Sequence, residues 1–187
     1  MHYQEGHYYH VYNRGAHRSA IFFEEENYRF LIRRINKCTK KFHITLVAYC
    51  LMPNHYHLLL RVDPGGNMGQ CLRSVFTSFT QAMNKRYLLS GTLFQGQCKR
   101  KHVRSQQHCL HLIRYIHRNP LKAQLVKDIS DWEFSDYHLW VDESKNSRKG
   151  SDIRDAMFGS GAEYRRFVDE FDEDDKTILK SIVFNEE

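Results

Sequence analysis

Two apolar segments joined by a two-residue turn constrain this fold most. Residues 44–52 are almost continuously apolar, and residues 55–62 alternate between two kinds of side chain. Only Pro53 and Asn54 separate them, and connections of this length join neighbouring antiparallel strands. Near-continuous apolar side chains are typical of a strand covered on one face or on both. We therefore predict an antiparallel hairpin whose first strand is central in its sheet.

The second strand of this hairpin sorts its side chains onto two faces. Alternation places Tyr56, Leu58 and Leu60 on one face and His55 and His57 on the other. Two imidazoles two residues apart on one face are close enough to bind one divalent ion. The chain has 12 histidines, so the pair alone is more often two half-exposed polar residues than a metal site.

The remaining elements follow in a regular order. We predict strands at residues 7–14 and within residues 92–104, and helices at residues 24–41, from residue 68 onward, and at residues 106–118. The third helix is expected to stop before Pro120, whose ring disfavours helical geometry in the preceding residue. The order β-α-β-β-α-β followed by a helix predicts an α+β, ferredoxin-like split βαβ sandwich. Its antiparallel sheet has helices packed on one face.

Charge divides the 187 residues into two parts. Residues 1–125, the predicted folded domain, hold 19 Lys and Arg against 5 Asp and Glu, a net charge of +14. Residues 126–187, a predicted C-terminal extension, hold 9 against 17, a net charge of −8. The extension comprises an aromatic segment, a polar linker at 144–152, a short helix at 162–171 and an acidic tail. A body this basic indicates a polyanionic partner.

Several classes of protein are excluded at this stage. The first residues lack the pattern of a secretory signal, and no stretch is apolar enough to span a bilayer. Five cysteines without a CxxC pair indicate reduced thiols, so we expect a cytoplasmic, nucleoid-associated protein without a membrane partner. A structural zinc site is an alternative, although its spacings match no familiar finger; its ligands would be Cys98, His102, His108, Cys109 and His111.

The third helix supplies a possible nucleophile. At 100° per residue, Cys109, Leu110, Ile113 and Ile116 form a core-facing sector, whereas Tyr115 and Asn119 fall together on the polar side. A tyrosine in mid-helix is normally a core or rim residue. If the polar side faced the two histidines, a phenol, an amide and two imidazoles would meet beside a basic rim. Those groups suit metal-assisted nucleophilic attack on a phosphodiester.

At these residues the chain resembles the single-tyrosine HUH transposases, and among them the REP-associated tyrosine transposases. The matching strings follow the order of the family over nearly the whole chain; they occupy residues 9–15, 49–60, 91–96, 112–123, 132–137 and 164–168. The resemblance implies that His55, His57 and Asn119 bind Mg²⁺ or Mn²⁺. It also implies that Tyr115 attacks single-stranded DNA and forms a 5′-phosphotyrosine link. The implied substrates are repetitive extragenic palindromes, and the implied assembly is a monomer or a homodimer.

Two positions depart from the pattern of the family. The residue between the histidines is usually a bulky hydrophobic, and here it is Tyr56, which points to the opposite strand face and is rejected as the nucleophile. Related insertion-sequence transposases tend to have glutamine where this chain has the shorter Asn119. The reach of Asn119 to a metal therefore depends on the helix end before Pro120.

Basic residues in or beside the matching strings are candidates for phosphate contacts, with a solvated basic face as the alternative for each. They are Arg14, Arg18, Lys99, Arg100, Lys101, Arg104, Arg114 and Lys122. Phe94 is a candidate for stacking on bases, with a core role at least as probable. The acidic residues 169–175 form either a solvated terminus or a segment that competes with DNA for the basic surface.

Three other functions remain open. A domesticated hairpin-binding protein would share the DNA partner but would not need His55, His57, Tyr115 and Asn119 together. A replication initiator or relaxase would share the histidine chemistry but would not explain residues 114–123. A zinc-stabilised RNA-binding protein is the most remote alternative.

Overall fold

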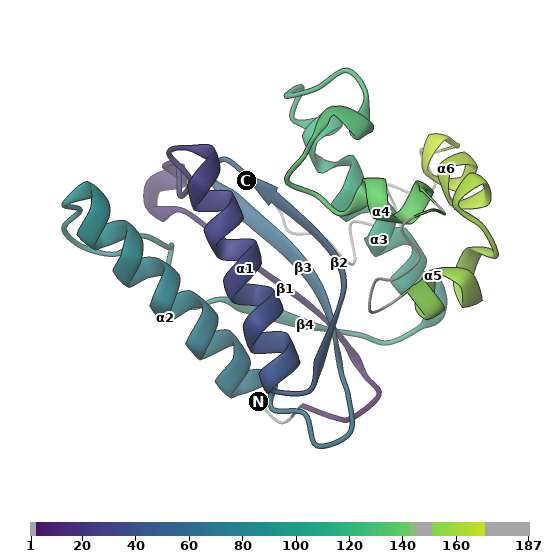
Figure 1. Cartoon of the computed structure of the whole chain (residues 1–187), viewed down its shortest axis with the longest axis horizontal. Helices are drawn as coiled ribbons and strands as arrows, with labels where there is room; N and C mark the ends of the chain where they lie inside the picture. The colour runs from purple at the N-terminus through teal and green to yellow at the C-terminus, as the bar shows by residue number, and fades with distance from the viewer. Residues whose placement is uncertain (1–2, 143, 145–150, 171–187) are drawn as a thin grey trace.

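A four-stranded antiparallel sheet forms the centre of the molecule in the computed structural model, which describes residues 3–142, 144 and 151–170 (Figure 1). The strand order is β2-β3-β1-β4. The strands are β1 (Tyr8–Arg14), β2 (Ile44–Met52), β3 (His55–Val62) and β4 (Lys99–Val103). The helices are α1 (Glu25–Lys41), α2 (Met68–Tyr87), α3 (Gln106–Lys122), α4 (Tyr137–Val141), α5 (Ser151–Phe158) and α6 (Gly161–Asp169). The predicted α+β class with an antiparallel sheet is confirmed.

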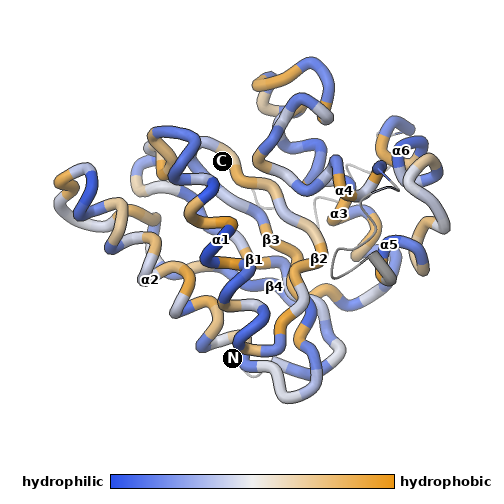
Figure 2. The backbone as a smooth tube through the Cα atoms, viewed as in Figure 1, coloured by the Kyte–Doolittle hydropathy of each residue, from blue (hydrophilic) through white to orange (hydrophobic). Residues whose placement is uncertain are grey.

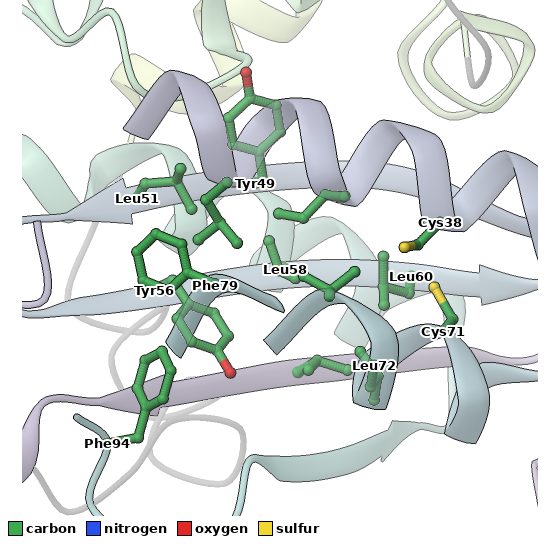
Figure 3. Close-up of a cluster of buried hydrophobic side chains, with 14 of the residues drawn as sticks. Cys38, Tyr49, Leu51, Tyr56, Leu58, Leu60, Cys71, Leu72, Phe79 and Phe94 are labelled. Carbon is green, nitrogen blue, oxygen red and sulfur yellow. The ribbon is translucent and has the colours of Figure 1, made fainter. Parts of the chain in front are cut away.

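Helices α1 and α2 lie side by side across one face of the sheet (Figure 1). Their apolar side chains pack against one face of β3, where Tyr56, Leu58 and Leu60 are fully buried, as the alternation predicts (Figure 3). Phe79 of α2 and Phe94 of the following loop complete this core beside Tyr56. Phe94 is buried here, which supports the core role weighed for it.

Helix α3 and the C-terminal helices cover the opposite face, so helices pack on both faces of the sheet and not on one as predicted. Cys109, Leu112 and Ile116 of α3 join a second apolar cluster with Leu59 of β3. Helices α4 and α6 pack on α3 from outside and bury Trp140. Hydrophobic segments of the backbone accordingly lie along β2 and β3, between the two layers (Figure 2). Because α3 is covered on two sides, Tyr115 and Asn119 are buried, while the expected core residue Leu110 is only half-buried.

Strand β2 lies at an edge of the sheet, so its predicted central position is wrong. Because successive side chains alternate, the apolar residues of β2 face both cores, and a register shift between Leu46 and Ala48 exchanges the two faces along the strand. The free edge is covered by residues of the C-terminal extension: Leu51 N donates to Phe134 O at 2.9 Å, and Asp136 N donates to Tyr49 O at 3.3 Å. Burial on two faces, rather than a central position, explains the continuous apolar run.

Helix α3 continues past Pro120 to Lys122, so the predicted stop before the proline is wrong. Proline lacks an N–H group and therefore removes one hydrogen bond, to the carbonyl of Ile116. The turn is retained because Ala123 N donates to Asn119 O at 2.9 Å. Pro120 itself is buried.

The C-terminal extension folds back on the body. In the aromatic segment, Trp132 Nε1 donates to Leu51 O at 3.0 Å, and the predicted short helix corresponds to α6. Most of the predicted polar linker, and the acidic tail after Glu170, lie outside the described residues. Among the described residues, no helix is both long and apolar enough to cross a membrane.

Candidate active site

One pocket opens where the end of β1 meets the start of β3. The antiparallel register sets Tyr12 beside His57 and Arg14 beside His55, so the alternation of two strands gathers these side chains on one sheet face. The pocket is lined by Tyr12, Asn13, Arg14, Arg18, Asn54, His55, His57, Gln95, Lys99 and Tyr115. The structure therefore brings His55, His57 and Tyr115 together, as the sequence predicts.

His55 is oriented by the residue before it. The Nδ1–H group of His55 donates to Asn54 Oδ1 at 2.7 Å, because a carbonyl oxygen only accepts hydrogen bonds. This bond assigns the proton to Nδ1 and leaves the Nε2 lone pair for a ligand. Asn54 is itself fixed, since its Nδ2 donates to Arg18 O at 3.1 Å and its backbone carbonyl accepts from Gly15 N.

His57 is buried beside another histidine. Its Nδ1 lies 2.9 Å from Nε2 of His10, a neighbour on β1, and the two rings stack with centroids 5.1 Å apart. Burial, followed by the charges of His10 and His55, holds the pKa of His57 well below its ordinary value. Burial and the Lys101 ammonium lower the pKa of His10 to about 3. Both imidazoles are therefore neutral near pH 7.

The ring of Tyr115 stands edge-on to His57, with centroids 5.4 Å apart. Cys109 and Ile113 anchor the same helix in the second core and so set the height of Tyr115 above the sheet. Lys122 Nζ lies 5.7 Å from the centroid of the same ring. A phenol, an imidazole and an ammonium group therefore lie close together at the sheet surface.

Asn119 is placed differently from the sequence expectation. Its Nδ2 donates to the carbonyl of Tyr115, one turn earlier in α3, at 2.8 Å. Asn119 is buried but is not among the residues that line the pocket. The structure thus groups two of the three predicted metal ligands in the pocket and leaves the third bonded to its own helix.

Tyr12 and Gln95 line the pocket and were not singled out from the sequence. Burial, and to a smaller extent Cys98, raises the pKa of Tyr12, so its hydroxyl is a hydrogen-bond donor at neutral pH. Gln95 accepts a hydrogen bond from Nε of Arg14, which orients that guanidinium. Both residues belong to strings that carry the family resemblance, which was the only available signal for them.

Five predicted DNA-binding residues lie on the pocket side of the molecule. Arg14, Arg18 and Lys99 line the pocket, and Lys122 stands over the Tyr115 ring. Lys101 pairs with His10 across β1 and β4, so it projects from the same sheet face. Four of these side chains place positive charge around the candidate nucleophile, and Lys101 extends that charge along the same sheet face.

The other three predicted DNA-binding residues do not reach this pocket. Arg114 is buried: it donates to Phe167 O at 2.9 Å, and its guanidinium lies 4.0 Å from the centre of the Phe167 ring. Arg100 points to the opposite sheet face, where it donates to the Tyr3 hydroxyl at 3.0 Å. Arg104 follows the far end of β4 and lines a different hollow, near α5. Arg114 therefore anchors the C-terminal extension to α3.

The zinc alternative is wrong for the described residues. His102 pairs with Tyr9 on the sheet face covered by α1 and α2. Cys109, a residue of α3, is buried on the other side of the sheet. No three His, Cys, Asp or Glu side chains gather as a metal site in the part of the chain that the structure describes. All five cysteines are free thiols.

Family comparison agrees with this geometry. Residues 3–119 match the IS200-like transposases, and the chain belongs to that family. Within it, the chain is 26% identical over 112 residues to the REP-associated tyrosine transposase of Escherichia coli, covering 59% of this chain. It is 28% identical over 104 residues, or 49% of this chain, to a Haemophilus influenzae protein whose name places it in the same group. The chain spans 65% and 58% of these relatives, respectively.

A solved structure shares the fold. It is that of a REP-associated tyrosine transposase bound to a REP hairpin, with a TM-score of 0.65 and 23% identity. The likeness covers 77% of this chain and 84% of the other. The likeness extends to residues beyond 119, because the segment matched by the family is shorter than this coverage.

Proposed function

We propose that this protein cleaves and rejoins single-stranded DNA at the foot of a hairpin. The observation that supports the proposal best is the placement of Tyr115 against His57 in a basic pocket, in a chain of the IS200-like transposase family. The hairpin substrate is inferred from the solved relative, which is bound to a REP hairpin. Positive side chains around the pocket suit a phosphate backbone.

In the proposed reaction, the Tyr115 oxygen attacks a DNA phosphorus atom. A bond forms between that oxygen and phosphorus, and the bond from phosphorus to the 3′ oxygen breaks. The phenol loses its proton, and the departing 3′ oxygen gains one. The product is a 5′-phosphotyrosine link with a free 3′-hydroxyl. A 3′-hydroxyl attacks the same phosphorus in the reverse step and releases Tyr115, so rejoining needs no ATP.

The donor atoms in the pocket fit a divalent cation. His57 Nε2 is buried without a hydrogen bond to the described residues, and the Asn54 contact leaves a lone pair on His55 Nε2. We propose that His55 and His57 hold Mg²⁺ or Mn²⁺, and that Asn119 becomes the third protein ligand by turning from its own helix toward the pocket. Imidazole donors favour Mn²⁺ over Mg²⁺. A bound cation would polarise the phosphate and neutralise charge as the leaving oxygen departs.

The chain's own residues would position the DNA. Arg14, oriented by Gln95, and Lys99 are placed to pair with phosphate oxygens at the mouth of the pocket. Lys122 would face the phosphate as it approaches Tyr115. Tyr12 would donate a hydrogen bond and not act as the nucleophile, because burial opposes its ionisation.

The test uses Tyr115→Phe with Tyr12→Phe as the matched control. Each full-length protein is incubated with a labelled hairpin carrying a single-stranded foot, in Mn²⁺, and covalent adducts are separated on denaturing gels. We expect Tyr115→Phe to lose the adduct and cleavage while binding DNA nearly as well as the wild type. Tyr12→Phe should still form the adduct. An adduct with Tyr115→Phe would refute the assignment of the nucleophile.

One observation favours a second function. Asn119 bonds to its own helix and does not line the pocket, so the third ligand is not in place. A domesticated protein that binds hairpins without cutting them would tolerate this arrangement. The same gels separate the two functions, because such a protein would shift the hairpin on native gels and form no adduct in Mg²⁺ or Mn²⁺.

A further inference from the structure

A third histidine stands behind the two that face the pocket, and the proposed mechanism gives it no role. His10 is 1% exposed, and its Nε2 lies 2.9 Å from His57 Nδ1. Its ring packs against those of His57 and Tyr12, with centroid distances of 5.1 Å and 4.7 Å, and these two rings lie 6.0 Å from each other. His10 therefore has little freedom to turn away from His57.

The shared hydrogen bond has two possible directions with different consequences. If His57 Nδ1–H donates to His10 Nε2, the His57 Nε2 atom carries a lone pair that can bind a cation. If His10 donates instead, His57 Nε2 carries the proton and cannot bind one. His10 Nδ1 and His57 Nε2 are both buried without a hydrogen bond to the described residues. Each direction thus leaves one buried donor and one buried acceptor unmatched.

A bound cation makes the two directions of the hydrogen bond unequal. It coordinates the lone pair on His57 Nε2 and so favours the direction in which His57 donates and His10 accepts. Metal-binding histidines commonly donate their other N–H to an acceptor that fixes the ring and the tautomer. His55 has such an acceptor in Asn54 Oδ1, at 2.7 Å. His10 occupies the equivalent place for His57.

The acceptor here is a neutral imidazole and not a carboxylate. A carboxylate behind His57 would add a negative charge close to the space proposed for a DNA phosphate. A neutral acceptor orients His57 and leaves intact the positive charge of Lys99 and Lys122 around the pocket. The identity of residue 10 therefore suits a site that must take both a cation and a polyanion.

We propose that His10 is a positioning residue that accepts a hydrogen bond from His57 and holds His57 Nε2 ready to bind the cation. The proposal rests on the metal site of the proposed function. It predicts that removing the acceptor weakens cation binding although the size of the side chain is preserved.

The binding test measures Mn²⁺ affinity of the full-length protein without DNA, by titration calorimetry or by the loss of the free Mn²⁺ electron paramagnetic resonance signal. His10→Phe keeps a ring and removes the acceptor, and we expect Mn²⁺ binding about 10- to 100-fold weaker. His10→Gln restores an acceptor and should recover most of the affinity. His102→Phe, a matched change on the other sheet face, should bind like the wild type. Equal Mn²⁺ affinity of His10→Phe and the wild type would overturn the proposal.

A second measurement separates failure of this proposal from failure of the metal site. Long-range ¹H–¹⁵N spectra of the metal-free wild type and of the protein with Mg²⁺ report which nitrogen of His57 carries the proton. We expect the proton on Nδ1 once the cation is present, with His10 protonated on Nδ1. A His57 proton on Nε2 in both samples would refute the role of His10. If the wild type bound neither cation, the proposed metal site would be wrong, and with it the role of His10. If His10→Phe bound Mn²⁺ as well as the wild type does, only the role of His10 would be refuted.

Discussion

A buried carboxylate fastens the C-terminal extension to the helix that bears Tyr115. Asp136 is fully buried and accepts hydrogen bonds from Tyr49 N at 2.6 Å, His117 Nε2 at 2.8 Å and Trp140 Nε1 at 3.0 Å. His117 in turn contacts the Tyr164 hydroxyl. One side chain thus joins β2, α3 and α4. We predict that Asp136→Asn strongly destabilises the protein.

The magnitude follows from the three donors. An asparagine oxygen can still accept from Tyr49 N and His117, but its NH₂ group then faces the Trp140 N–H. The change removes one charge-assisted bond, worth about 1.5–3 kcal/mol, and leaves a buried donor unmatched, at a further 1–3 kcal/mol or so. We expect the free energy of unfolding to fall by about 2.5–6 kcal/mol. With a urea m-value of about 2 kcal/mol/M, the midpoint drops by about 1.3–3 M.

Urea unfolding followed by far-UV circular dichroism is the assay, and Glu133→Gln is the control. Glu133 pairs with Arg29 at 3.5 Å, and both side chains are more than half exposed. Its loss should cost less than about 0.5 kcal/mol. A loss below about 1 kcal/mol for Asp136→Asn would show that the network does not stabilise the fold as its geometry indicates.

Two further predictions concern positions around the site. A Cβ added at Gly15 would lie 2.0 Å from a backbone oxygen, so Gly15→Ala should lower the free energy of unfolding by about 1–3 kcal/mol. Gly69→Ala in α2 meets only ordinary contacts and should raise that free energy by about 0.5–1 kcal/mol. Thermal unfolding measures both changes. A stable Gly15→Ala protein would contradict the described loop. Lys99→Ala should lower the salt dependence of DNA binding by about 0.7 in log–log slope for each phosphate that the variant no longer neutralises. Arg114→Ala should leave that slope unchanged but lower the free energy of unfolding. A smaller slope with an unchanged free energy of unfolding would show that Arg114 contacts DNA.

Local patterns were sufficient to predict the strands and the faces of their side chains. The alternation in β3 placed His55 and His57 opposite Tyr56 because a strand has only two faces. The same pattern misplaced β2 as a central strand. The edge is covered by residues around Phe134, more than 80 positions later, and no local pattern reports such a contact.

The pocket was predictable only in part, for the same reason. Helical periodicity grouped Tyr115 with Asn119, but the hydrogen bond of Asn119 to its own helix depends on the course of α3 through Pro120. Arg114 is covered by α6, which lies about 50 residues later in the sequence. The residues next to Arg114 do not report this contact, so the sequence indicated an exposed basic side chain. His10 belongs to a matching string, as Tyr12 does, but its contact with His57 depends on the register between β1 and β3.

The covering of β2 has a consequence for synthesis on the ribosome. Strand β2 ends at Met52, but its outer edge is covered by residues that include Asp136. At about 5–20 residues per second, roughly 4–17 s separate the synthesis of these two positions. During that interval the nascent chain presents an apolar strand with an open edge, the kind of surface on which other chains pair. Early termination within the extension is therefore expected to yield an aggregation-prone fragment and not a smaller working domain.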